Sequence, residues 1–130
     1  MESITLKEIA GYLPFYLDIL PIKRPYMYGH YEEKKMTIWV LNRFNLEDIK
    51  PLLYPLSMLT QPINHNGKEI IPIEEIDSLA ESVSYYSIDF YIRSTKFLPF
   101  WVIEKLYEWH FDVHGLIPRG LAIDKSKVNL

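Results

Sequence analysis

The stretch Phe97–Asp124, FLPFWVIEKLYEWHFDVHGLIPRGLAID, has the strongest hydrophobic pattern in the chain, and we expect the fold to form around it. At 100° per residue, Val102, Leu106, Trp109 and Val113 fall on one line, and other apolar side chains widen this stripe. The charged residues gather on the opposite side: Glu104, Lys105, Glu108 and Asp112. The pattern predicts an amphipathic helix over residues 99–114 that buries more apolar surface than any other element.

Both ends of this helix carry local signals. Pro99 suits the first helical position, where its missing N–H costs nothing. Gly115 can adopt the left-handed conformation that follows a helix, and Pro118 prevents the helix from resuming. Trp101 falls on the polar side, so either another segment covers it or it is exposed for a partner.

Three stretches predict a small, mainly antiparallel sheet. Leu17–Ile22 and Met36–Leu41 are candidate partners across residues 23–35, which are expected to form an exposed polar loop or the tip of a long hairpin. In Val83–Arg93 the residues Ile88, Phe90 and Ile92 alternate with polar ones, which indicates a third strand at Ile88–Ile92. A helix that continues from residue 74 is the alternative for this segment. We therefore expect an α+β fold in a single domain, residues 1–130, with this sheet packed against the long C-terminal amphipathic helix.

Shorter elements follow from turn and capping residues. Thr5 and Glu8 have capping-box spacing at the start of a short helix that Gly11 ends. Asn66-Gly67 predicts a type I′ turn in a β-hairpin, which Pro62 and Pro72 confine to the edge of the sheet or to an isolated ribbon. Short helices are also expected after Asn45 and over residues 73–82, and a short extended piece over residues 121–123.

Composition excludes several classes of protein. The 130 residues contain no cysteine, so neither a disulfide framework nor a thiolate zinc site or nucleophile is available. No apolar run approaches the roughly 18 residues that span a bilayer, and the first residues lack a secretion signal, so a cytoplasmic protein without membrane partners is expected. The net charge of −3 disfavours general nucleic-acid binding.

Few residues offer catalytic chemistry. His110 and His114 have the four-residue spacing of zinc helices, and His30, His65 or Glu69 would have to supply a third ligand. The alternative is that both histidines only make hydrogen bonds within the fold. Because no catalytic motif or matched third ligand is evident, we expect no metal and no cofactor. A metal-dependent hydrolase or nuclease that uses His110 and His114 remains an alternative. Glu104 and Glu108 lie one helical turn apart, as two carboxylates for acid–base catalysis could, but on the polar face of the helix they are expected to be solvated.

Tyrosine is the unusual residue of this chain, with ten copies. Tyr26, Tyr28 and Tyr31 lie in the polar loop, where no core obviously buries them, and tyrosine is enriched at interfaces. These three and Trp101 are our candidate interaction residues. Basic residues at both ends of the loop, next to these rings, make a nucleic-acid patch an alternative, although acidic residues of the same loop cancel much of that charge.

One set of segments carries a resemblance: Lys50–Thr60, His65–Lys68, Ile71–Glu74, Ile103–Asp112, Gly115–Ile117 and Gly120–Ile123. These segments resemble small proteins from bacteriophages and from prophage regions of gut bacteria. The resemblance covers the C-terminal two thirds, from about Leu46, and excludes the polar loop. It implies a phage or mobile-element accessory protein without transferable catalytic residues. We therefore expect a non-enzymatic protein that binds a host or phage protein, for example as an inhibitor that modulates the host, or a second copy of itself.

Overall fold

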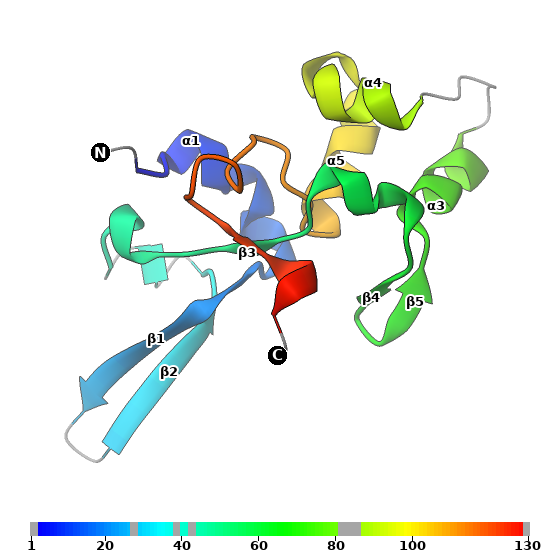
Figure 1. Ribbon diagram of the computed structural model, residues 1–130. Helices are drawn as coiled ribbons and strands as arrows, with labels where there is room; N and C mark the ends of the chain where they lie inside the picture. Colours follow the sequence, from blue (N-terminus) through cyan, green and yellow to red (C-terminus); the bar gives the residue numbers. More distant parts are fainter. Residues whose placement is uncertain (1–2, 27–28, 38–39, 42–43, 81–86, 129–130) are drawn as a thin grey trace.

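The computed structural model describes residues 3–26, 29–37, 40–41, 44–80 and 87–128, with the backbone alone over residues 21–33. Short helices and short strands alternate along the chain (Figure 1). The helices are α1 (Leu6–Ile9), α3 (Pro72–Leu79), α4 (Ile88–Arg93) and α5 (Phe100–Glu108). The strands are β1 (Asp18–Tyr26), β2 (Gly29–Lys35), β3 (Leu52–Leu53), β4 (Ile63–His65), β5 (Lys68–Ile70) and β6 (Ile123–Asp124). The 3₁₀ helices span Ala10–Phe15, Leu46–Asp48, Leu56–Thr60, Thr95–Phe97 and Lys125–Lys127.

The predicted sheet is wrong, although the fold has both helices and strands. The described strands form three separate two-stranded sheets: β1 pairs with β2 and β4 with β5 in antiparallel fashion, and β3 pairs with β6 in parallel fashion. The β1–β2 ribbon contains most of the predicted strand Leu17–Ile22 and continues into the described part of residues 23–35, as the tip of a long hairpin would, with Lys23 opposite Glu32. The strand predicted at Met36–Leu41 is wrong in its described residues, because β2 ends at Lys35 and residues 40–41 are helical.

The predicted strand Ile88–Ile92 is also wrong, because these residues form helix α4. Ser87 caps this helix by accepting a hydrogen bond from the Phe90 amide at 3.2 Å. The side chain that α4 buries is Tyr91, which is 1% exposed, whereas Ile92 is 47% exposed. The alternation of apolar residues therefore predicted the wrong buried face. The Ser87 cap favours a helix over these residues.

The long C-terminal helix predicted over residues 99–114 is wrong as well, because α5 has only nine residues. The chain leaves the helix at His110, whose φ of 63° is left-handed. The Phe111 amide then bonds the Leu106 carbonyl at 2.8 Å, and the His110 amide bonds the Tyr107 carbonyl at 3.0 Å, which is a Schellman ending. Gly115, with φ of 67°, serves a later turn instead.

Pairing with a distant segment accounts for this early ending. Tyr54, next to β3, donates its amide to the His110 carbonyl at 2.8 Å and accepts from the Asp112 amide at 2.9 Å. Tyr54 and Phe111 thereby form a parallel bridge that a continued helix could not make. Phe111 therefore pairs with Tyr54 as a single bridge residue after the helix. Asp112, expected on a solvated helix face, is 5% exposed and accepts hydrogen bonds from the Leu116 and Ile117 amides at 2.7 and 2.9 Å.

Several local predictions are confirmed. Thr5 and Glu8 form the reciprocal capping box at the start of α1. Asn66 and Gly67, with φ of 52° and 82°, form the turn of the β4–β5 hairpin. The prediction that Gly11 ends the first helix is wrong, because Gly11 lies inside the 3₁₀ helix that follows α1, where a Cβ would lie 2.4 Å from the Tyr107 ring.

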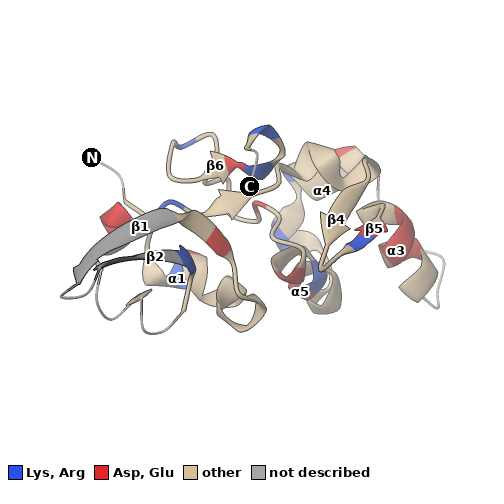
Figure 2. Cartoon of the chain, turned by 90° about the horizontal axis from the view of Figure 1, so that it is seen from below, with Lys and Arg blue, Asp and Glu red and all other residues tan. Residues whose placement is uncertain are grey.

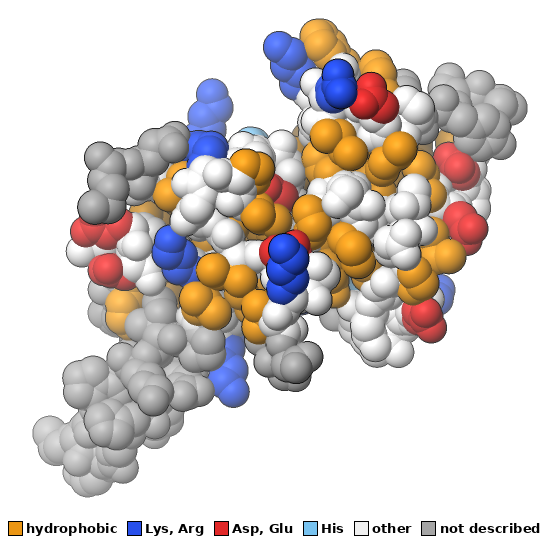
Figure 3. Space-filling view, viewed as in Figure 1, with side chains coloured by type: hydrophobic (Ala, Val, Ile, Leu, Met, Phe, Trp, Pro, Cys, Tyr) orange, Lys and Arg blue, Asp and Glu red, His pale blue; other side chains and the backbone are white. Residues whose placement is uncertain are grey.

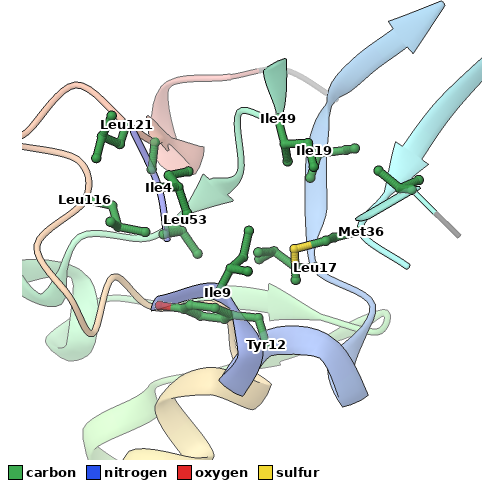
Figure 4. Packing of buried hydrophobic residues seen from close by; sticks show 12 residues of the cluster. Ile4, Ile9, Tyr12, Leu17, Ile19, Met36, Ile49, Leu53, Leu116 and Leu121 are labelled. Atoms are coloured by element: carbon green, nitrogen blue, oxygen red, sulfur yellow. The ribbon is translucent and has the colours of Figure 1, made fainter. Parts of the chain in front are cut away.

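The buried side chains form two clusters, one in each half of the molecule. The first contains residues from α1, the start of β1 and the segment 116–122 (Figure 4). The second lies between α3, α4, α5 and the β4–β5 hairpin. Figure 2 shows these halves side by side, with β6 and the C-terminal segment between them. Tyr12, which is fully buried, joins them: its hydroxyl donates to the Phe111 carbonyl and accepts from the Val113 amide at 3.1 Å.

Within the described part of the chain, no helix has both the length and the apolar character that crossing a bilayer requires.

Candidate functional site

A polar cavity of about 390 Å³ lies where the two halves meet. The segments 14–16 and 64–66 form part of its wall. Its charged lining residues, among those described, are Asp18, Lys35, Glu108 and Lys125, and His110 also lines it. The β4–β5 turn, the end of α5 and the start of β1 thus contribute polar groups to one place, although they are far apart in sequence.

An ammonium group lies at the centre of this cluster. Lys125, which begins the last 3₁₀ helix, has a side chain that is only 14% exposed. Its Nζ donates to Asp18 Oδ2 at 2.8 Å and lies 3.4 Å from His110 Nδ1. It also lies 5.2 Å from the centre of the Tyr54 ring, a cation–π arrangement. A carboxylate, an imidazole and an aromatic ring therefore replace the water that this buried charge loses.

Asp18 holds a second lysine as well. Lys35, at the end of β2, pairs with Asp18 Oδ1 and is half exposed. Burial acts to raise the pKa of Asp18, but the hydrogen bonds from Lys125 and Lys35 outweigh it and hold that pKa below its usual value. One ionised carboxylate therefore neutralises two ammonium groups only in part.

His110 is buried and uses both ring nitrogens within the protein. Nε2 lies 2.9 Å from the Phe15 carbonyl oxygen, which can only accept, so Nε2 carries the proton. Nδ1 then accepts from Lys125. Burial lowers the pKa of His110 to about 4, against the opposing effect of the Phe15 hydrogen bond. The imidazole is therefore neutral near pH 7.

His65 lies against His110 from the hairpin. Their ring centres are 6.1 Å apart and the rings are edge-on. Burial lowers the pKa of His65, and its Nε2 lies 3.3 Å from Asn66 Nδ2. From the sequence, His65 is a candidate only as one of several alternatives for the third ligand of a metal. The Asn66-Gly67 turn is the local signal that could have placed His65 at this site.

The structure does not bring His110 and His114 together as a helical metal pair. Since α5 ends before His110, the four-residue spacing no longer places both rings on one helix face. His114 Nε2 instead lies 2.8 Å from the Tyr107 hydroxyl. In the part of the chain that the structure describes, no group of three His, Cys, Asp or Glu side chains could hold a metal ion. Of the two carboxylates Glu104 and Glu108, Glu108 forms an ion pair with Lys105 at 3.0 Å.

A second feature is apolar. A groove of about 310 Å³ is lined mainly by apolar side chains between the segments 55–57 and 113–118 and by Ile92 of α4. Four residues between α4 and the first turn of α5 are exposed by 39% to 76%: Ile92, which also lines the groove, and Phe97, Phe100 and Trp101. We call these four residues the aromatic surface. Figure 3 shows hydrophobic side chains gathered over α4 and on the face next to it.

The predicted interaction residues have different outcomes. Trp101 is 39% exposed and belongs to the aromatic surface. Tyr26 lies in β1 and Tyr31 in β2, but their side chains are outside the described ones, and Tyr28 lies outside the described residues. Phe100, assigned from the sequence to the buried stripe, is 76% exposed because the helix begins there and packs from Val102 onward.

No family model, no curated protein and no solved structure matches this chain.

Proposed function

We propose that this protein acts by binding another protein, through the apolar groove and the aromatic surface beside it. The observation that carries the proposal is the exposure of Phe97 and Phe100, at 68% and 76%, in the segment that follows the groove-lining residues Ile92 and Thr95. Exposed apolar patches rarely occur without an interaction role, and aromatic anchors that fill pockets dominate binding energy.

The charges near this surface describe the partner. Lys96 lies over the Phe97 ring at 5.2 Å, and Arg93 pairs with Asp89 on the exposed side of α4. With Asp112, which lines the groove, these described charges cancel around an apolar centre. We therefore propose a partner that inserts an apolar side chain into the groove.

A non-enzymatic role is supported by the way the buried polar groups are used. His110 engages both nitrogens, Asp112 bonds two amides, and the Tyr12 hydroxyl bonds the chain at residues 111 and 113. A general base must reach a substrate proton, which groups already engaged inside the fold cannot easily do. These three residues hold the structure together, and we assign them no catalytic role.

The biological setting of the proposal rests on the resemblance of residues 46–123 to phage and prophage proteins. On that basis the partner is a host or phage protein in the bacterial cytoplasm. Tyr26 and Tyr31 are a second proposed contact, together with Tyr28 from the same stretch of sequence, because the β1–β2 ribbon projects from the body of the molecule (Figure 1).

Paired capture experiments test the proposal. The tagged protein and its Phe97→Ser/Phe100→Ser variant would be incubated with lysates of infected and uninfected host cells. Both rings are exposed, so the variant should stay within roughly 1 kcal/mol of the parent in stability. Loss of two anchors should weaken capture by about tenfold or more. Leu79→Ser, which removes another exposed apolar side chain from α3, is the matched control and should leave capture unchanged.

Other outcomes would replace the proposal. Equal capture by the parent and the double variant would exclude the aromatic surface. Light scattering that shows a dimer in the parent and a monomer in the variant would identify a second copy as the occupant. Recovery of nucleic acid with a steep salt dependence would favour the nucleic-acid alternative. Stoichiometric metal, lost on changing His110 and His114 together, would favour a metal-dependent hydrolase.

A further inference from the structure

We infer that the polar cavity around Lys125 is a binding site for a small molecule that carries a carboxylate or phosphate group. This site is separate from the apolar groove and does not depend on the protein-binding proposal. It rests on the cavity and on the charged and polar side chains that line it.

The charge of the lining favours an anion. Lys35 and Lys125 share the single carboxylate of Asp18, which leaves one positive charge over. Glu108, the other described acidic residue of the lining, is paired with Lys105 outside the cavity. The cavity is therefore locally positive, although the chain as a whole carries −3. Its partly enclosed position strengthens that field relative to an exposed lysine.

The lining also supplies hydrogen-bond donors, both from a half-exposed lysine at the cavity wall and from a buried one. Lys35 has three N–H groups, of which Asp18 needs one, and this side chain is 52% exposed at the cavity wall. Lys125, only 14% exposed, fixes the carboxylate from the inner side. Asn64 and Asn66 add amide groups from the hairpin turn, where the Asn64 Oδ1 already accepts from the Gly67 amide at 3.0 Å. The Asn64 NH₂ group is thereby oriented away from that bond.

The volume of the cavity and the residues of its wall indicate the size and polarity of the rest of the ligand. A cavity of about 390 Å³ is larger than a single oxyanion needs and lies within the usual range for small-molecule sites. Because the remaining wall contains His65 and the two asparagines together with Pro14, Phe15 and Tyr16, we expect a ligand body that has both polar and apolar groups. Inorganic phosphate or acetate alone should bind only weakly.

The test is a titration of the full chain followed by NMR, with inorganic phosphate and acetate as two separate probes at matched ionic strength. The expected result is saturable shifts of the His65 ring and of the Asn64 and Asn66 amides, with a Kd on the order of millimolar. The probe that binds more tightly identifies the group that the natural ligand carries. The absence of saturable shifts at these positions with either probe, up to about 50 mM, overturns the inference.

Matched variants make the test specific. Lys35→Gln should weaken binding by roughly fourfold, the effect of one charge about 5 Å from the anion in water. Lys127→Gln removes the same charge from an 81% exposed side chain of the same 3₁₀ helix as Lys125 and should change nothing. Asp18→Asn should tighten binding, whereas a purely structural ion pair predicts no gain. If Asp18→Asn does not fold, equal affinities for Lys35→Gln and Lys127→Gln would still refute the site.

Discussion

The buried His110 should make the protein lose stability as the solution becomes mildly acidic. Burial depresses the pKa of this imidazole from 6.5 to about 4 in the folded protein. Above pH 6.5 the ring is neutral in both the folded and the unfolded chain, so it contributes no pH dependence. As the pH falls from about 6.5 towards 4, the unfolded chain binds a proton that the folded chain does not, and the free energy of unfolding decreases.

The size of this loss follows from the two pKa values. Each pKa unit is worth about 1.4 kcal/mol, so lowering the pH from about 7.5 to 5 should cost about 2 kcal/mol. This window lies above most of the range in which Glu8 matters, because its pKa, which the hydrogen bond from Arg119 lowers from 4.5 to about 2, makes stability fall mainly as the pH drops from about 4.5 towards 2. His65 and His114 have pKa values lowered by burial and act in the same direction.

Urea unfolding at both pH values measures the effect, and two variants isolate it. His110→Asn keeps a residue that tolerates the left-handed conformation and should remove most of the loss. His114→Asn should retain most of it. A parent protein whose unfolding free energy changes by less than about 0.5 kcal/mol over this window would refute the burial argument. An NMR titration that gives His110 a pKa of 6 or above would do the same.

Three further substitutions test the packing around the site, each measured by urea unfolding. Leu106→Ala, at a fully buried position of α5, should cost about 2–5 kcal/mol, and a loss well under 1 kcal/mol would show that α5 packs by another face. Asp112→Ala should cost about 3 kcal/mol or more, since it leaves two amides without their charged acceptor; an unchanged midpoint would mean that water replaces the carboxylate. Gly11→Ala should cost about 1–3 kcal/mol because its methyl group would meet the Tyr107 ring, and Tyr107→Ala in the same chain should remove the clash, so that the two losses are not additive.

The parts of the fold that the sequence predicts are those decided within a few residues. The Thr5–Glu8 capping box and the Asn66-Gly67 turn depend on side chains next to the backbone that they shape. The buried line of α5 through Leu106 is also local, because one helical turn sets it. The prediction of a strand at Ile88–Ile92 is wrong because alternation over five residues is also compatible with a helix. The side chain of Ser87 caps that helix.

The candidate cavity could not be predicted from spacing. Asp18 and Lys125 lie more than a hundred residues apart along the chain and meet in an ion pair of 2.8 Å. Each is an ordinary charged residue in its own segment. The parallel pairing of Leu52 and Leu53 with Ile123 and Asp124 draws the C-terminal segment inward, and no local signal indicates this pairing.

The end of α5 connects the failed prediction to the site. A helix continued to residue 114 would have kept residues 110 and 112 inside a helical backbone, where the Tyr54 bridge cannot form. By adopting a left-handed conformation instead, His110 ends the helix, pairs its carbonyl with the Tyr54 amide and turns its ring between Phe15 and Lys125. A non-glycine residue in this conformation carries a conformational cost, which the three contacts offset. The departure from local preference therefore occurs at the residue that joins the two halves and forms part of the cavity wall, as expected where tertiary or functional demands override local sequence rules.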